Sequence, residues 1–258
     1  MKKHILDLTV TSNEQLSSNY ILLKLTATTQ LPSMSPGQFA QLRVDGSQTT
    51  FLRRPISINL IDEDKNEVWF LIQTIGDGTK ALAKLRVGDS LNVVLPLGNH
   101  FTYPTEPNAS PLLIGGGVGI APLLLLGREL SKKGITPSFL LGARSKEDLL
   151  ELEEFKKYGK VYTTTEDGSH GEKGYVTQHS LLTERGFSHL YTCGPKPMMM
   201  AVAKYAKANQ LFCEVSLENT MACGFGACLC CVEKTDKGHV CACTEGPVFN
   251  INQLVWPI

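Results

Sequence analysis

Residues 113–122 read Leu-Ile-Gly-Gly-Gly-Val-Gly-Ile-Ala-Pro. An apolar segment enters a glycine-rich loop, and a proline follows where helices commonly begin. Glycine allows the backbone to approach a dinucleotide closely, so we expect a ligand to meet Gly115, Gly116, Gly117 and Gly119. The spacing is not G-x-G-x-x-G, and a tight turn without a ligand is the alternative.

Strand and helix patterns alternate around this loop. We expect strands at 111–114, 137–141, 161–165 and 189–192, and helices at 122–133, 147–157 and 196–208. This alternation predicts a parallel α/β sheet over residues 104–211. Cys193, Gly194 and Pro195 follow the fourth strand at the carboxyl edge, where such sheets bind ligands. A buried thiol before a helix is the alternative there.

The residues before the Pro104-Thr-Glu-Pro107 linker follow a different pattern. Short alternating segments separated by glycine and proline predict an antiparallel β-barrel or sandwich over residues 1–103. We expect strands at 20–25, 38–44, 57–61, 67–73 and 90–95, and one short helix at 80–85 that Thr79 caps.

Two segments of this first domain have the composition of a phosphate site. Arg53-Arg-Pro-Ile-Ser57 lies between two predicted strands, and Gly76-Asp-Gly-Thr79 opens the short helix. Free N–H groups at a helix N-terminus bind phosphate, and an arginine supplies the opposite charge. Together they predict a clamp for a pyrophosphate, although an isolated Arg-Arg pair is more typical of an exposed basic loop.

Charge and cysteine usage exclude several classes of protein. The 25 basic residues equal the 25 acidic ones, so we expect neither a nucleic-acid partner nor a membrane surface. The N-terminus lacks a signal-peptide core, which predicts a cytoplasmic protein. In that reducing compartment, cysteines clustered between Cys223 and Cys243 indicate a metal or an iron–sulfur cluster rather than disulfides.

The cysteine spacing favours one kind of cluster. Cys223-x4-Cys228-x2-Cys231, followed by a later cysteine, is the plant-type 2Fe–2S pattern. Zinc is the alternative, but Cys241-x-Cys243 is closer than the usual second pair. We expect residues 212–258 to form a small 2Fe–2S cluster domain, too short to build a core without a staple.

These motifs together resemble a known family. Arg54-Pro-Ile-Ser57, Gly78-Thr79, the glycine loop and Cys193-Gly-Pro195 resemble the ferredoxin–NADP⁺ reductase superfamily. The cysteine segment and the tail Cys243-Thr-Glu-Gly-Pro-Val-Phe249 resemble the electron-transfer subunits of class 1B dihydroorotate dehydrogenases. The resemblance covers essentially the whole chain, in the same order.

The resemblance implies three cofactor sites. FAD would be bound by Arg54, Pro55, Ile56, Ser57, Leu71, Ile72, Gln73, Gly78 and Thr79. NAD would meet Gly115, Gly116, Gly117, Gly119, Cys193, Gly194 and Pro195, with Cys193 the candidate catalytic residue near the nicotinamide. The 2Fe–2S cluster would be held by Cys223, Cys228, Cys231 and Cys243, which leaves Cys230 and Cys241 as extra thiols.

Two departures leave questions open. Many such reductases have an aromatic residue where Ile56 stands. Arg144 and Ser145 suit the 2′-phosphate of NADP, whereas Glu166 and Asp167 repel it, so these residues do not decide between NAD and NADP.

The resemblance also implies a partner. Electrons would pass from an FMN-containing subunit that oxidises dihydroorotate, through the cluster and FAD, to NAD⁺, in a heterotetramer with two subunits of each kind that serves pyrimidine (UMP) biosynthesis. FAD fits between the other carriers because a flavin exchanges one or two electrons. The alternatives are a ferredoxin-NAD(P)H or sulfite or sulfide reductase subunit with another partner, and a zinc-stapled nucleotide-binding regulator without turnover.

Overall fold

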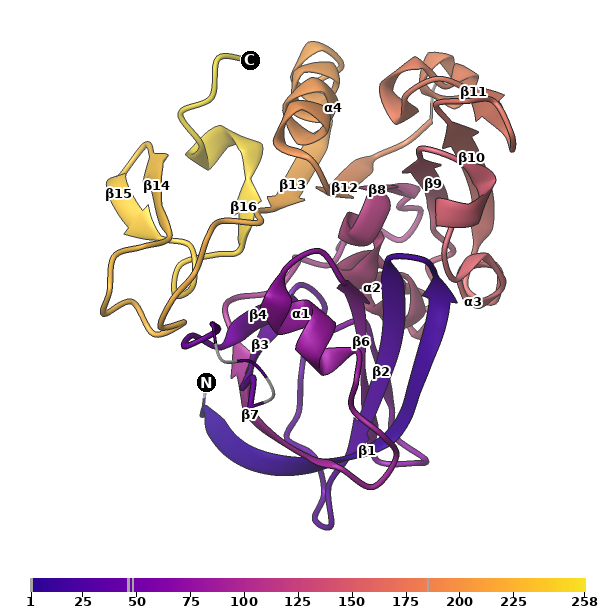
Figure 1. The fold of residues 1–258 in the computed structure, drawn as a ribbon. Helices are drawn as coiled ribbons and strands as arrows, with labels where there is room; N and C mark the ends of the chain where they lie inside the picture. Colours follow the sequence, from indigo (N-terminus) through magenta and orange to yellow (C-terminus); the bar gives the residue numbers. More distant parts are fainter. Residues whose placement is uncertain (1, 46, 48, 185) are drawn as a thin grey trace.

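The computed structural model describes residues 2–45, 47, 49–184 and 186–258. Figure 1 shows a curved N-terminal sheet, a central sheet flanked by helices, and a C-terminal lobe of loops and short strands that lies beside both. No helix of the described residues is long and apolar enough to cross a membrane.

The N-terminal sheet of the described chain has seven strands in the order β4-β3-β7-β1-β2-β6-β5, and every pairing is antiparallel. Its strands are β1 (His4–Ser17), β2 (Tyr20–Thr26), β3 (Phe39–Leu42), β4 (Arg54–Ser57), β5 (Leu60–Asp62), β6 (Glu67–Gln73) and β7 (Ser90–Leu97). The predicted antiparallel barrel is therefore confirmed. The long strand β1, which pairs with both β2 and β7, was absent from the sequence prediction.

Three local predictions in this domain were wrong. Arg54–Ser57 forms strand β4 rather than a loop, because it pairs with β3 from Phe39 to Leu42. The predicted strand over 57–61 is consequently divided between β4 and β5. The helix α1 (Asp77–Leu82) has Gly76, not Thr79, at its N-cap. The Thr79 hydroxyl instead accepts a hydrogen bond from the Gly76 N–H at 3.2 Å.

The central sheet also has seven strands within the described chain, in the order β11-β10-β9-β8-β12-β13-β16. They are β8 (Pro111–Gly116), β9 (Ser138–Ala143), β10 (Lys160–Thr165), β11 (Glu172–Lys173), β12 (His189–Cys193), β13 (Phe212–Ser216) and β16 (Val248–Asn250). All neighbours are parallel except β13 and β16. The predicted parallel α/β sheet is confirmed, and β13, placed by prediction at the start of the third domain, pairs with β12 in this sheet.

The helices of this part are α2 (Ala121–Lys132), α3 (Leu152–Lys156) and α4 (Lys196–Ala208). The helix predicted over 147–157 is wrong in extent: a 3₁₀ turn at Lys146–Asp148 precedes the short α3. The interruption occurs at Glu151, whose φ of 56° lies in the left-handed region that a helix cannot include.

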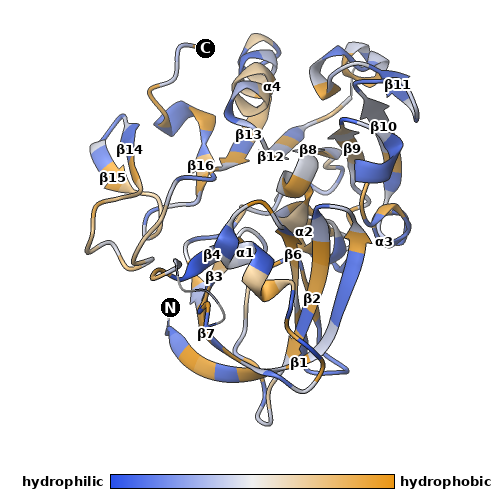
Figure 2. Ribbon diagram, in the orientation of Figure 1, coloured by the Kyte–Doolittle hydropathy of each residue, from blue (hydrophilic) through white to orange (hydrophobic). Residues whose placement is uncertain are grey.

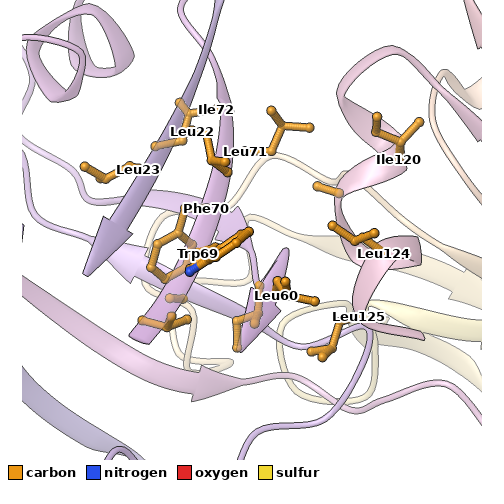
Figure 3. Close-up of a cluster of buried hydrophobic side chains, with 14 of the residues drawn as sticks. Leu22, Leu23, Leu60, Trp69, Phe70, Leu71, Ile72, Ile120, Leu124 and Leu125 are labelled. Carbon is orange, nitrogen blue, oxygen red and sulfur yellow. The ribbon is translucent and has the colours of Figure 1, made fainter. Parts of the chain in front are cut away.

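The two large domains share one apolar core. Figure 3 shows Leu60 of β5 near Leu125 of α2, with Trp69 and Phe70 of β6 to their left. Figure 2 shows hydrophobic residues along β6 and hydrophilic residues on α3. Ionic contacts add to this packing, because Arg128 and Lys132 of α2 both contact the Glu63 carboxylate after β5.

The C-terminal lobe contains a hairpin of β14 (Val232–Thr235) and β15 (Gly238–Cys241). Its apolar residues join a second core that includes Phe39 and Leu97 of the barrel and Phe249 of β16. Asn99 after β7 donates to the carbonyl oxygens of Glu245 and Val248 at 2.9 and 2.7 Å. The cysteine segment is thus attached to both larger domains.

Candidate functional site

The first part of the site is where β4 meets α1. A Cβ on Gly78 would lie 2.7 Å from Nε of Arg54, so the glycine lets the guanidinium lie over the first turn of the helix. Arg54 Nη1 donates to the Leu52 carbonyl at 2.9 Å, and the guanidinium has no carboxylate partner among the described residues. A free arginine beside a helix N-terminus fits the phosphate groups of FAD.

The neighbouring arginine has a different role. Arg53 Nη1 donates to the backbone oxygens of Gln41 and Asn92 at 3.3 and 3.0 Å. These bonds join β3 to β7, so the guanidinium of Arg53 is engaged within the barrel. Of the Arg-Arg pair in the sequence, only Arg54 remains to bind a ligand.

The other predicted FAD residues lie on two strands. Pro55, Ile56 and Ser57 are half-buried on β4. Leu71 and Ile72 are buried in the barrel core, which leaves only their backbone to a ligand. Gln73, one residue further, lies at the edge of a large cavity.

That cavity is the second part of the site. Its volume is about 620 Å³, and residues from both large domains line it. The barrel contributes Asn19, Tyr20 and Gln73, and the central sheet contributes Gly116 and Gly117 from the carboxyl end of β8. Pockets of this size hold small ligands and cofactors.

The four loop glycines divide into two pairs. Gly116 and Gly117 line the cavity, and Gly117 has a φ of +55°. Gly115 and Gly119 instead allow close packing beneath it. A Cβ on Gly119 would lie 2.5 Å from the Cys193 carbonyl oxygen, and one on Gly115 would lie 2.8 Å from Cγ2 of Ile120. Gly115 and Gly119 do not line the cavity, so direct contact of these two glycines with a ligand stays a prediction.

Cys193 lies behind the cavity wall rather than in it. Its side chain is buried, and its sulfur is 3.9 Å from Oε1 of Glu218. Burial, together with the Glu218 carboxylate, raises the pKa of the Cys193 thiol well above its ordinary value. Pro195 and Glu218 form the cavity surface next to it, and the Gly194 backbone lies against Gly116.

Glu218 is a residue that the sequence analysis missed. It stands two residues beyond the end of β13, at the carboxyl edge of the sheet, and it lines the cavity. Desolvation by the surrounding protein atoms raises the pKa of its carboxyl above the ordinary value for glutamate. An acidic residue directly after a sheet strand was the available signal, but β13 was not recognised as part of this sheet.

Two charged side chains lie at the far end of the cavity, away from Glu218. Arg144 follows β9 and Glu166 follows β10, and both line the cavity. No hydrogen bond or ion pair joins them within the described chain. Ser145 and Asp167 lie outside the lining, and the Asp167 carboxylate accepts two bonds from Ser169, at 2.9 Å from N and 2.6 Å from Oγ. Of the four residues weighed for nucleotide choice, only Arg144 and Glu166 therefore line it.

The cysteine loop is the third part of the site. The Phe225 N–H donates to Cys223 Sγ at 3.3 Å. This hydrogen bond makes the largest contribution to lowering the pKa of Cys223 to about 6. The Gly226 N–H donates to Cys243 Sγ at 3.1 Å, and the Cys243 N–H donates to Cys231 Sγ at 3.4 Å. Backbone donors aimed at sulfurs suit thiolate ligands of a cluster.

The remaining thiols differ in their surroundings. Cys228 and Cys230 are exposed, and the Cys241 thiol faces the Gly226 carbonyl oxygen at 3.9 Å. The described residues contain no group of three His, Cys, Asp or Glu side chains at metal-binding distance, so ligand assignment stays a prediction. Burial raises the pKa of Cys243 to about 12, and binding of a metal would displace that proton.

Family models match the chain in the same three parts. A model of the oxidoreductase FAD-binding domain matches residues 7–103, and one of the oxidoreductase NAD-binding domain matches residues 113–204. A model of the iron–sulfur cluster binding domain of dihydroorotate dehydrogenase B matches residues 218–255. The fold and site therefore define a flavin- and nicotinamide-dependent oxidoreductase with an appended iron–sulfur domain.

Full-length relatives narrow the class. The chain is 37% identical over 250 residues to the dihydroorotate dehydrogenase B (NAD(+)) electron transfer subunit of Fusobacterium nucleatum, covering 94% of this chain and 95% of that protein. It is 40% identical over 225 residues to the subunit of the same name from Shouchella clausii, covering 85% and 86%. The chain belongs to the family of dihydroorotate dehydrogenase B (NAD(+)) electron transfer subunits.

Solved structures share the fold. A structure described for flavin-based electron bifurcation by the NADH-dependent reduced ferredoxin-NADP oxidoreductase is 28% identical, with a TM-score of 0.86 over 96% of this chain and 90% of that one. The Amycolatopsis cytochrome P450 reductase GcoB, at 23% identity and a TM-score of 0.68 over 81% of this chain and 67% of that one, shares the fold alone. The predicted family, fold class, oxidoreductase function and cofactors FAD, NAD and iron–sulfur cluster are confirmed.

Proposed function

We propose that this chain passes electrons from an FMN-containing, dihydroorotate-oxidising subunit through a 2Fe–2S cluster and FAD to NAD⁺, in pyrimidine biosynthesis. Two copies of each subunit would form the heterotetramer. The relatives named as electron transfer subunits support a catalytic partner. The observation that carries the proposal is the cysteine loop itself. Its backbone N–H groups point at cysteine sulfurs, and its side chains Phe225 and Leu229 are exposed to solvent.

Each domain has one task in this proposal. Residues 1–103 bind FAD, 104–211 bind NAD, and 212–258 bind the cluster. FAD, when bound, supplies the exchange between single electrons and electron pairs. Arg54 would neutralise its phosphates at the start of α1, and β4 would supply further contacts to it.

The cavity residues orient the nicotinamide dinucleotide. Gly116 and Gly117 let the backbone approach its phosphates, because neither carries a side chain. Pro195 and Glu218 border the nicotinamide end, with Cys193 buried behind them. Tyr20 and Gln73 line the cavity from the barrel, so a dinucleotide bound there would lie between the two large domains.

The exposed face of the cysteine loop is the proposed docking surface for the catalytic subunit. Phe225 and Leu229 are 43% and 64% exposed within the loop, beside the exposed Cys228. Lys3 lies over the Phe225 ring at 5.0 Å and adds a charge at the rim. A partner bound here would bring its own redox centre close to the cluster.

Co-expression with a dihydroorotate-oxidising FMN subunit tests the proposal. We expect the two chains to purify together and to reduce NAD⁺ with dihydroorotate. Leu229→Asp should separate them while the cluster spectrum persists, because it places a charge in the interface. Val87→Asp, at a 71% exposed position of the barrel, is the matched control and should leave the complex intact. Co-purification that Leu229→Asp does not affect would contradict the docking surface.

One finding favours a second candidate. The match to the NADH-dependent reduced ferredoxin-NADP oxidoreductase structure covers 96% of the chain. A chain with this machinery and a ferredoxin-linked partner would reduce ferredoxin or NADP⁺, and it would not co-purify with a dihydroorotate-oxidising subunit. Assays of the native complex with dihydroorotate as the electron donor, and with ferredoxin or NADP⁺ as the electron acceptor, separate the two functions.

A further inference from the structure

Gln41 on β3 has an unusual environment. Its side chain is fully buried, yet neither Nε2 nor Oε1 has a hydrogen-bond partner in the described structure. A buried polar group left unsatisfied destabilises the folded protein, because it has lost its hydrogen bonds to water. The amide is therefore placed to bind something that the chain alone does not provide.

The strand directs this amide toward the cysteine segment. Side chains alternate along β3, so Ala40 and Leu42 enter the barrel core while Phe39 and Gln41 lie on the other face. Phe39 belongs to the core that also contains Cys231 and Cys243. Gln41 thus faces the cluster-binding lobe from within the flavin domain.

The cysteine loop passes directly over the amide. A Cβ on Gly224 would lie 3.0 Å from Cγ and 3.1 Å from Nε2 of Gln41. Gly224 has a φ of +77° and follows Cys223 in the chain, so the loop needs a glycine where it meets Gln41. Leu97, the other neighbour of Gly224 on this face, offers no polar atom.

We propose that Gln41 Nε2 donates a hydrogen bond to a sulfur atom of the bound cluster, on the side held by Cys223. Gln41 is then a positioning residue that sets the reduction potential of the cluster. Hydrogen bonds to cluster sulfurs are one of the ways in which a protein sets that potential. A donor stabilises the more negative, reduced cluster, so it raises the potential. The inference rests on the proposed ligand role of Cys223.

The position of Gln41 also connects the cluster to the flavin strand. Gln41 is the register partner of Pro55 on β4, in the segment proposed to bind FAD. One residue therefore lies between the cysteine loop and the flavin-binding strand. A change at Gln41 should alter the cluster directly and the flavin little.

Redox titration of the purified, cofactor-loaded protein, followed by electron paramagnetic resonance, tests the proposal. Gln41→Met keeps the size of the side chain and removes the donor. We expect the equilibrium constant for cluster reduction to fall about tenfold, equivalent to about 59 mV for a one-electron couple. Gln41→Glu should lower it further because it adds a negative charge. The FAD potential is the internal reference and should stay unchanged.

Controls separate this role from packing and from the ligand assignment. Gln30→Met, the same substitution at an exposed position, should leave both potentials unchanged. An intact cluster with an unchanged potential in both Gln41 variants would overturn the proposal, as would a shift of the FAD potential alone. A wild-type protein without a cluster would overturn the ligand assignment instead. If Gln41→Met does not retain the cluster, Gln41→Glu alone decides. A cluster potential in Gln41→Glu equal to that of the wild-type protein would contradict the hydrogen bond.

Discussion

The Gly226 N–H points at the sulfur of Cys243 over 3.1 Å, while the carbonyl of the same residue faces the Cys241 thiol at 3.9 Å. One glycine thus distinguishes two cysteines that are two positions apart. An N–H donor stabilises a thiolate, whereas a carbonyl oxygen repels one. The relationship supports Cys243 as the fourth cluster ligand.

Replacement of single cysteines tests that choice. Cys243→Ser should abolish the visible absorbance of the cluster and reduce bound iron, because one thiolate is lost. Cys241→Ser and Cys230→Ser are the matched controls and should keep both. Absorbance spectra and iron analysis of the three purified variants provide the measurement. Bleaching by Cys241→Ser together with an intact Cys243→Ser would exchange the two assignments.

Arg54 should determine how tightly FAD binds. Arg54→Ala removes a charge-assisted hydrogen bond to phosphate, so we expect FAD affinity to fall about 10- to 100-fold. Equilibrium binding of FAD, followed by fluorescence, measures the change. Arg86→Ala, at an exposed position of the same domain, should have no effect. Equal affinities for Arg54→Ala and wild type would place the phosphates elsewhere.

The contact between Asn59 and Glu151 should make stability depend on pH. Asn59 Nδ2 donates to Glu151 Oε2 at 3.0 Å across the two large domains, while Asn59 Oδ1 and Glu151 Oε1 are buried without partners. Burial raises the pKa of Glu151 from 4.5 to about 7, with the Asn59 hydrogen bond and Lys24 opposing and Glu154 and Glu14 adding to the rise.

The sign follows from the raised pKa. The protonated acid is the form that the fold favours, so this contribution to stability is present below the unfolded-state pKa of 4.5 and is lost as the pH rises through about 7. The loss is at most about 3 kcal/mol. Glu151→Gln should remove the dependence, as chemical unfolding between about pH 5 and about pH 8 would show. Glu153→Gln, exposed on α3, is the control, and a slope that persists in Glu151→Gln would assign it to another group.

Glu166 should exclude NADP from the cavity. Its carboxylate lines the far end with no partner among the residues described, so it can bind ribose hydroxyls and repel a 2′-phosphate. Glu166→Ser should raise kcat/KM for NADPH about tenfold, with Arg144 left to bind the added phosphate. Steady-state diaphorase assays with NADH and NADPH measure the preference. Asp167→Ser, outside the cavity lining, is the matched control, and an identical effect in both variants would contradict the assignment.

Local sequence patterns predicted most elements but few of their limits. The helix over 196–208 was placed correctly because a proline at its start and an apolar face are local signals. The helix over 147–157 failed at Glu151, whose backbone is left-handed and whose side chain accepts a hydrogen bond from Asn59 in the other domain. Strand β1 was missed because its burial pattern, with Leu8 and Val10 inside, is set by strands far along the chain.

The residues of the candidate site also fall into those that local motifs indicated and one that they did not. Motif spacing and family resemblance indicated Arg54, Gly116, Gly117 and the cysteines, because glycine and thiol patterns impose their chemistry locally. Glu218 escaped because nothing near it in sequence shows that β13 brings it to the edge of the cavity.

The sequence by itself determined the class of protein: a flavin barrel, a parallel nucleotide-binding sheet and a cysteine loop, in that order. Only the tertiary structure decided how the surroundings of similar residues differ. Arg53 and Arg54 are neighbours, as are the loop glycines and the late cysteines, and composition alone does not distinguish them. The distinction arises because hydrogen bonding and burial depend on distant strands: Arg53 bonds to β3 and β7, Gly119 packs on Cys193, and Cys243 meets the Gly226 N–H.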